Sequence, residues 1–157
     1  MEDFLNYKKP SMFLITCRCD WKCCIEQHIP ITSCQNNNII NMSEKVFDYS
    51  DILNLYYSDD ITKSIVIGGL EPLLQWDEVY GLIKYIRAYQ NENNLIEDDI
   101  VIYTGYNKEE ILQYIEQLKV FNNIIIKYGR YIPGRNSKYD DILGINLISD
   151  NQYSEKI

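Results

Sequence analysis

The sequence predicts an α/β protein in which a mostly parallel sheet forms a partial, open βα barrel, with residues 1–157 as a single domain. The first observation is an alternation, because β-branched runs of five to six residues are separated by amphipathic stretches of ten to fifteen. This order is typical of parallel strands joined by helical crossovers. The second observation is length, since the four or five units found here are too few for a closed eight-unit barrel of about 250 residues.

The predicted strands are short apolar runs. Residues 11–16 follow Pro10 and supply the first, and residues 64–69 end in two glycines, as a buried strand of a parallel sheet does. Further strands are predicted at residues 99–104 and 123–127, and residues 142–149 are expected to form the last strand.

The predicted helices follow the apolar spacing of 3.6 residues. Residues 76–90 place Val79, Leu82, Ile83 and Ile86 on one face. Residues 108–119 show the same spacing, and a further helix is predicted over residues 43–57, with Val46 on its apolar side. The carboxyl ends of parallel strands meet at one edge of a sheet, so segments that follow the strands are expected to converge there.

Composition excludes some classes of partner. The chain has 157 residues, of which 46% are hydrophobic, and a net charge of −8 without a basic stripe. Nucleic acid is therefore not expected as a partner, because its phosphates need clustered Lys and Arg. We also expect no membrane span and a cytoplasmic location, since no apolar run approaches the roughly 20 residues that cross a bilayer and the first ten residues are polar.

The five cysteines are confined to one segment. They stand at positions 17, 19, 23, 24 and 34, together with the only histidine, His28. Structural core cysteines scatter singly, whereas a cluster just after an apolar strand indicates a metal or iron–sulfur site.

Two kinds of metal site are compatible with this segment alone. One is a structural zinc site from Cys19, Cys23 or Cys24, Cys34 and His28. The other is a four-iron cluster held by three thiolates, which leaves one iron free to bind a small molecule. The segment does not decide between Cys23 and Cys24 as a ligand.

A glycine motif ends the second predicted strand. It runs Gly68-Gly69-Leu70-Glu71-Pro72. Glycines let backbone groups approach a ligand closely, and a carboxylate suits an ammonium group. A strand-ending turn is the simpler interpretation of two adjacent glycines, but their place one βα unit after the cysteine segment favours a ligand site.

The order of these motifs resembles that of the radical S-adenosylmethionine family, and in particular the activating proteins of anaerobic ribonucleotide reductases. The resemblance covers nearly the whole chain, with the third cysteine displaced by an insertion of eight residues. Further departures are the extra Leu70 and Tyr128 where the family has Asp. The motifs are Cys19-x3-Cys23, Cys34-Gln35-Asn36, the glycine motif, Tyr103-Thr104-Gly105-Tyr106, Tyr128-Gly129-Arg130-Tyr131 and Ser149-Asp150-Asn151-Gln152.

The resemblance implies a radical oxidoreductase with two cofactors. Cys19, Cys23 and Cys34 are then the ligands of a [4Fe–4S] cluster, and the radical made from S-adenosylmethionine takes a hydrogen from a glycine of a large partner enzyme. An electron donor such as flavodoxin or ferredoxin is implied as well. The residues expected to bind S-adenosylmethionine are Gly68, Gly69, Glu71, Thr104, Gly105 and Asn151.

Two alternatives stay open at this point. A radical enzyme of this family can act on a small molecule instead of a protein. The second alternative is a different class of function, a non-catalytic α/β binding module that a structural zinc ion stabilises.

Overall fold

A six-stranded sheet forms the centre of the computed structural model, which describes residues 2–58 and 60–157. Its strand order is β1-β2-β3-β4-β5-β8, and β2 to β5 run parallel while the edge strands β1 and β8 are antiparallel to their neighbours. A separate two-stranded sheet pairs β6 with β7. The strands are β1 Glu2–Asp3, β2 Ser11–Thr16, β3 Ser64–Gly69, β4 Asp99–Tyr103, β5 Ile124–Tyr128, β6 Lys138–Asp140, β7 Ile145–Leu147 and β8 Tyr153–Lys156.

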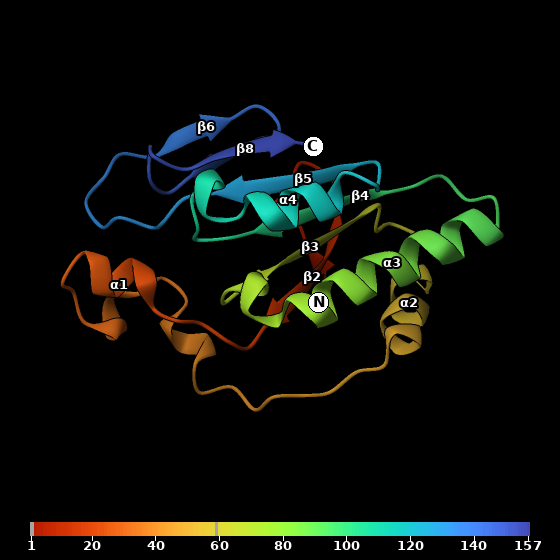
Figure 1. Ribbon diagram of the computed structural model, residues 1–157, viewed down its shortest axis with the longest axis horizontal. Helices are drawn as coiled ribbons and strands as arrows, with labels where there is room; N and C mark the ends of the chain where they lie inside the picture. The colour runs from red at the N-terminus through yellow and green to blue at the C-terminus, as the bar shows by residue number, and fades with distance from the viewer. Residues whose placement is uncertain (1, 59) are drawn as a thin grey trace.

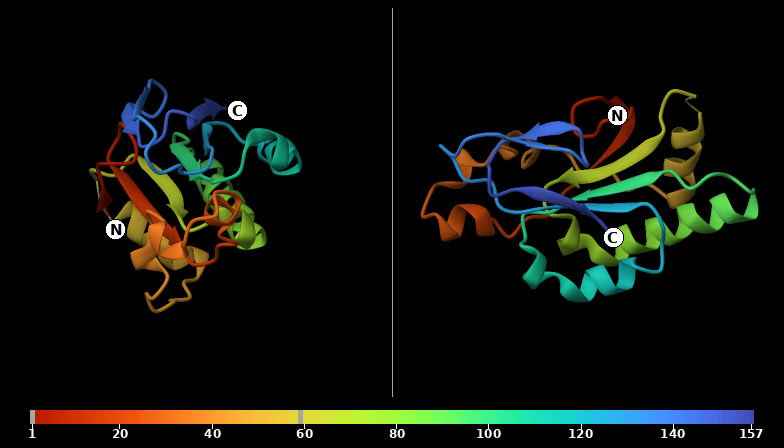
Figure 2. Two further views of the ribbon diagram at one scale, coloured as in Figure 1. Left: turned by 90° about the vertical axis from the view of Figure 1, so that its left-hand side faces the viewer. Right: turned by 90° about the horizontal axis from the view of Figure 1, so that it is seen from above.

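Helices connect the parallel strands and lie mainly on one side of the sheet. Figure 1 shows α3 and α4 along one face, with α2 beside α3 and α1 beyond the end of the sheet. The N-terminal segment and the β6–β7 hairpin lie on the opposite face (Figure 2). The α-helices are α1 Lys22–Glu26, α2 Tyr49–Tyr57, α3 Trp76–Glu92 and α4 Leu112–Leu118, and the 3₁₀ helices are η1 Ile31–Ser33, η2 Asn37–Ile39, η3 Pro72–Gln75 and η4 Lys108–Glu110.

The core has two layers because side chains alternate along each strand. On β3, Ile65 and Ile67 face the helices, whereas Val66 faces the N-terminal segment and the hairpin. The second layer is closed by Tyr7 and Leu143, which are both fully or nearly fully buried. The helix-free face of the sheet is therefore filled at one end by the chain itself.

Most predicted strands are confirmed. The runs at 11–16 and 64–69 are strands over those residues, and the runs at 99–104 and 123–127 are strands shifted or shortened by one residue at an end. The strand predicted at 142–149 is wrong as the last strand of the main sheet, because only Ile145–Leu147 is extended and it pairs with β6. The last strand of the main sheet is β8, which the sequence analysis missed because Tyr153–Lys156 has no apolar run.

The helix predicted over residues 43–57 begins only at Tyr49. Val46 is 99% exposed and Phe47 is 56% exposed, so no packed face exists to stabilise an earlier start. Asp48 takes an extended backbone conformation as the residue before the first turn. The helices predicted over 76–90 and 108–119 are confirmed, the second as η4 followed by α4.

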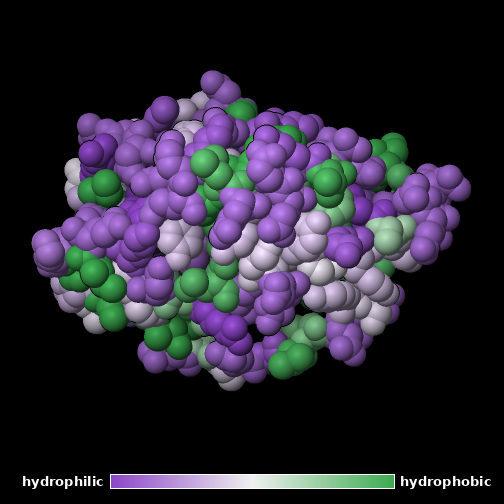
Figure 3. Space-filling view, in the orientation of Figure 1, coloured by the Kyte–Doolittle hydropathy of each residue, from purple (hydrophilic) through white to green (hydrophobic). Residues whose placement is uncertain are grey.

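The molecular surface seen from the side of α3 and α4 is mainly hydrophilic, with apolar side chains in separate small groups (Figure 3). Of the helices in the described part of the chain, none combines the length and the apolar character needed to cross a bilayer.

Candidate functional site

A cavity of about 650 Å³ opens where the parallel strands end. The cysteine segment covers it on one side, and the rest of its wall comes from the strands β2 to β5 and the segments that follow them, from the β6–β7 hairpin, and from Leu5, Asn6 and Gln152. The polar and sulfur-bearing lining residues that matter for chemistry are Cys19, Cys23, Cys34, Asn36, Glu71, Thr104, Lys127 and Gln152.

Three of the five cysteines line this cavity. They are Cys19, Cys23 and Cys34, whereas Cys24 is only 1% exposed and does not belong to the lining. Cys17 lies outside it as well and donates from its thiol to Gln75 Oε1 at 3.4 Å. The cavity therefore distinguishes Cys23 from Cys24, which the sequence does not.

Without a metal, the thiols of Cys19 and Cys23 are protonated at neutral pH. Burial raises the pKa of Cys19 to about 11 and that of Cys23 to about 12, and the neighbouring thiols add to both shifts. Metal binding must then release protons, so cluster assembly is expected to be favoured at higher pH. Within residues 2–58 and 60–157, no three histidine, cysteine or acidic side chains are close enough to surround a single metal ion. The thiolates of a four-iron cluster bind different iron atoms and need not converge on one point.

The cysteine segment is tied to the glycine motif by polar contacts. The Asn36 side-chain amide donates to the carbonyl of Gly69. Gln75 Oε1 accepts from the backbone N–H of Cys17 at 2.7 Å and of Arg18 at 3.2 Å. The Glu71 N–H donates to the Arg18 carbonyl at 2.8 Å. These bonds hold the cysteines at the end of β3.

Glu71 is buried and receives three hydrogen bonds from the chain. Its Oε1 accepts from Leu73 N at 3.1 Å and from Thr104 Oγ1 at 2.8 Å, while Oε2 accepts from Gly105 N at 2.9 Å. A carboxylate has about four acceptor positions, so one position on Oε2 is left for a ligand. Burial raises the pKa of Glu71 to about 7, against the opposing effect of these donors.

Gly69 has a backbone that suits glycine. Its φ is +91°, and a Cβ at this position lies 2.8 Å from Ile15 Cγ2. Gly68 does not belong to the cavity lining, and its missing side chain leaves room for the Cβ of Tyr103 and the ring of Phe13, two residues that do line it. Gly69 is thus part of the cavity wall, and Gly68 lies outside the wall and makes room for two residues that form it.

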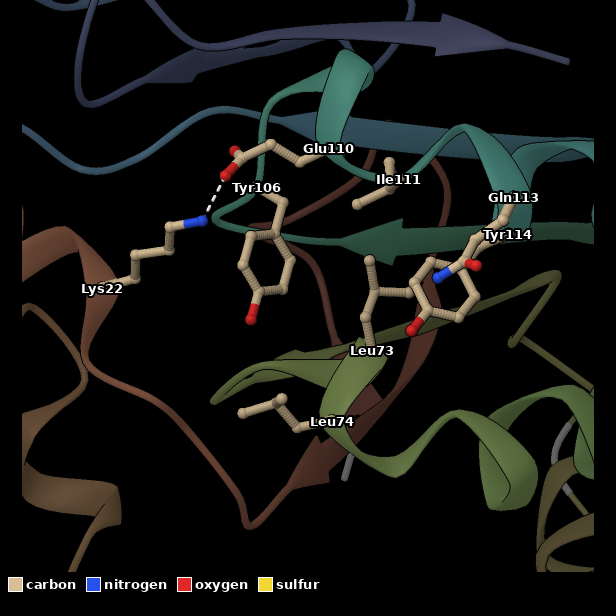
Figure 4. Close-up of a pocket in the computed structure, with 8 residues that line it drawn as sticks. All are labelled: Lys22, Leu73, Leu74, Tyr106, Glu110, Ile111, Gln113 and Tyr114. Atoms are coloured by element: carbon tan, nitrogen blue, oxygen red, sulfur yellow. Dashed lines mark hydrogen bonds and ion pairs between the residues drawn. The ribbon is translucent and has the colours of Figure 1, made fainter.

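A cluster of charges fastens α1 to the ends of β4 and β5. Arg130 forms ion pairs with Glu26 of α1 and with Glu110 of η4, and it donates to the Gly105 carbonyl at 3.2 Å. Lys22 of α1 also pairs with Glu110, beside the ring of Tyr106 (Figure 4). The Arg130 guanidinium holds the pKa of Glu110 well below its usual range. A smaller cavity of about 210 Å³ lies here, between Lys22, Tyr106 and Leu73, and no cysteine lines it.

The turn at residues 149–152 braces the same region. Asn151 Nδ2 donates to the Arg130 carbonyl at 2.9 Å, and Gln152 Nε2 donates to the Gly129 carbonyl at 3.2 Å. Gln152 lines the cavity and Asn151 does not. The turn therefore positions the segment after β5.

The structure brings together seven of the nine residues singled out from the sequence. Only Gly68 and Asn151 fall outside the cavity wall. Two residues were not assigned to the site from the sequence: Lys127, which lines the cavity, and Arg130, which forms ion pairs with Glu26 of α1 beside it. The signal for Lys127 was a lysine directly after three isoleucines in a buried strand. The seven residues are Cys19, Cys23, Cys34, Gly69, Glu71, Thr104 and Gly105.

Comparison with known proteins gives one match. A family model described as a 4Fe-4S single cluster domain matches residues 9–152. The matched region contains the cysteine segment, the glycine motif and the turn at 149–152. A search of the curated proteins gives no match, and neither does a search of the solved structures. The family match supports a [4Fe–4S] cluster and favours it over a zinc site.

Proposed function

The chain belongs to the family of 4Fe-4S single cluster domains, and from this premise we propose that it is a radical S-adenosylmethionine activase. In this proposal Cys19, Cys23 and Cys34 hold one [4Fe–4S] cluster. Three protein thiolates would leave one iron of the cluster without a protein ligand, and that iron would be the one to bind S-adenosylmethionine. The observation that carries the proposal is that these three thiols share one cavity with Gly69, Glu71 and Thr104.

The residues of the cavity have separate tasks. Glu71 offers the remaining acceptor position of Oε2 to an N–H of the cofactor's amino group. The backbone of Gly69 lets the methionine part approach the strand end closely. When bound, the cluster supplies the electron that splits S-adenosylmethionine into methionine and a 5′-deoxyadenosyl radical. That electron comes from a donor of the flavodoxin or ferredoxin type.

The proposed substrate is a glycine in a large glycyl radical enzyme of the anaerobic ribonucleotide reductase type. The radical removes one hydrogen atom from the glycine, which yields 5′-deoxyadenosine and a glycyl radical. An open, partial βα barrel leaves one side of the cavity accessible to such a partner. In support, the cavity wall includes Leu5, Met42 and Ile148, which are 81%, 57% and 43% exposed. Apolar groups at an open rim suit contact with another protein.

The first experiment tests the cluster ligands. Anaerobic reconstitution of the single variants Cys19→Ala, Cys23→Ala and Cys34→Ala should give colourless protein without bound iron. The matched controls Cys17→Ala and Cys24→Ala should remain brown and keep their iron. Full iron retention in Cys34→Ala contradicts the ligand set. If Cys24→Ala loses its iron and Cys23→Ala keeps it, the ligand is Cys24 and not Cys23.

The second experiment tests the reaction. Reduced protein, S-adenosylmethionine and a candidate anaerobic ribonucleotide reductase are mixed without oxygen, and the doublet of a glycyl radical is sought by electron paramagnetic resonance. If no radical forms while a small molecule stimulates cleavage of S-adenosylmethionine, the substrate is that small molecule.

A further inference from the structure

Tyr106 fastens the loop that carries Cys19 to the end of β4. Its hydroxyl donates to Asp20 Oδ2 at 2.5 Å, across 86 positions of the chain. Its backbone N–H donates to Thr104 Oγ1 at 3.0 Å, so the strand end orients the residue. The hydroxyl points away from the ion pair between α1 and η4 (Figure 4). Neither Tyr106 nor Asp20 lines the large cavity, so their contact acts on the loop and not on a ligand there.

Asp20 holds the turn that follows Cys19. Its other oxygen, Oδ1, accepts from the backbone N–H of Lys22 at 3.1 Å, which is the hydrogen bond of an Asx turn. The residue enclosed by this turn is Trp21, whose φ of 57° and ψ of 22° are left-handed. A bulky residue rarely adopts this conformation and keeps it only where the surrounding contacts impose it. The two hydrogen bonds of Asp20 are such contacts.

The left-handed turn directs the backbone N–H of Trp21 at the sulfur of Cys19. The N–H donates to Cys19 Sγ at 3.3 Å, and the Trp21 carbonyl accepts from the first turn of α1. A hydrogen bond to a ligand sulfur stabilises negative charge on it, and such bonds help to set the reduction potential of an iron–sulfur cluster. The reduced cluster carries one more electron than the oxidised cluster, so this hydrogen bond favours the reduced state.

We propose that Tyr106 and Asp20 are positioning residues that raise the reduction potential of the cluster, because they hold the Trp21 N–H on Cys19 Sγ. The inference rests on the part of the proposed function in which Cys19 is a cluster ligand. Without the Tyr106 hydroxyl, the carboxylate of Asp20 keeps only its bond to Lys22, and the turn relaxes from its left-handed conformation. The Trp21 N–H then leaves the sulfur, and the cluster accepts an electron less readily.

The experiment measures the reduction potential of the reconstituted wild type and of Tyr106→Phe, which lacks only the hydroxyl. Both are titrated with reductant without oxygen while electron paramagnetic resonance reports the reduced cluster. At a fixed potential, the ratio of reduced to oxidised cluster should fall about three- to tenfold in Tyr106→Phe, because part of one hydrogen bond to a charged group is lost. This is a negative shift of about 30–60 mV, at 59 mV per tenfold for one electron.

A second tyrosine provides the matched control. Tyr56 also donates from its hydroxyl to an aspartate, Asp98, at 2.8 Å. Asp98 directly precedes β4, so this bond lies at the end of the sheet opposite to the cysteine segment. Tyr56→Phe should therefore give the reduction potential of the wild type.

Two further measurements separate the hydrogen bond from a change of charge near the cluster. Electron–nuclear double resonance of the reduced wild type, compared in normal and deuterated buffer, should show an exchangeable amide proton coupled to the cluster. Tyr106→Phe and Asp20→Ala should both weaken this coupling. Because Tyr106 acts through Asp20, adding Tyr106→Phe to Asp20→Ala should shift the reduction potential no further.

The outcomes distinguish this inference from the proposed function. An unchanged potential in Tyr106→Phe, or a shifted potential with an unchanged amide coupling, overturns the inference while the proposed function stands. An equal further shift from Tyr106→Phe in the Asp20→Ala background also overturns it. A wild type that assembles no cluster on Cys19 overturns both.

Discussion

Replacement of Arg130 by methionine should release α1 from the sheet while leaving the strands in place. Methionine keeps much of the length of the side chain but removes the guanidinium. The ion pairs to Glu26 and Glu110 and the hydrogen bond to Gly105 are lost together. Because α1 contains Cys23, the change should loosen one side of the proposed cluster site.

The free-energy cost of losing these ion pairs follows from how exposed Arg130 and its two carboxylate partners are. The side chain of Arg130 is 8% exposed, whereas those of Glu26 and Glu110 are 45% and 28% exposed. Breaking a fully buried pair costs about 3–5 kcal/mol and an exposed pair less than about 1 kcal/mol. Water can reach both carboxylates here, so we expect about 2–3 kcal/mol. This corresponds to an increase of about 30- to 150-fold in the local opening of α1.

Hydrogen exchange measures this opening directly. The amides of Cys24 and Ile25 both donate to the Trp21 carbonyl, at 2.9 and 3.0 Å, and report on the first turn of α1. Their exchange should accelerate in Arg130→Met, while the amides of β3 should exchange as in the wild type. The rate at which a chelator removes iron from the reconstituted protein should rise in parallel.

A second arginine provides the control. Arg135 pairs with Asp150, and both side chains are nearly half exposed, so Arg135→Met should change neither measurement. Arg130→Lys should recover only part of the effect, because an ammonium cannot form the forked contacts of a guanidinium. Unchanged exchange of α1 in Arg130→Met, or an equal change in Arg135→Met, refutes the reasoning.

Two further changes test the glycine motif. Gly69→Ala should lower the free energy of unfolding, measured in urea, by about 2–4 kcal/mol, because alanine is strained in the left-handed region and its Cβ meets Ile15. The control Gly134→Ala should lower it by only about 1 kcal/mol, because Gly134 has a φ of +81° but no atom within 4 Å of the added Cβ. The pKa of Glu71, about 7 in the fold, predicts that stability of the cluster-free protein decreases as pH rises from 5 to 8, because the native state holds a proton that the unfolded chain has lost. Glu71→Gln should flatten this decrease, and an unchanged slope contradicts the assignment.

The sequence predicted the parallel strands well because their signal is local. The runs that became β2 to β5 are continuous and β-branched, and their carboxyl ends share one edge of the sheet in any parallel arrangement. The convergence of Cys19, Glu71 and Gly105 follows from that rule alone. The sequence left Cys23 and Cys24 open as alternatives, and the fold separates them, because Cys23 lines the cavity whereas Cys24 is buried outside its lining.

The missed features depend on contacts between distant segments. Arg130 acts through Glu26 and Glu110, which lie 104 and 20 positions away, so no local pattern marks it. The β8 strand is polar and becomes a strand only because β5 has a free edge. Residues 43–48 have helical spacing but no surface to pack against, and tertiary contact decides the outcome.

The central claim is that three thiolates hold a cluster whose fourth iron faces a cofactor site at the end of the sheet. Electron paramagnetic resonance of the reduced, reconstituted protein, recorded with and without S-adenosylmethionine, tests it most directly. We predict one [4Fe–4S] signal whose g values shift when S-adenosylmethionine is added, since the ligand binds iron. A cluster signal that is identical in the presence of saturating S-adenosylmethionine contradicts the account.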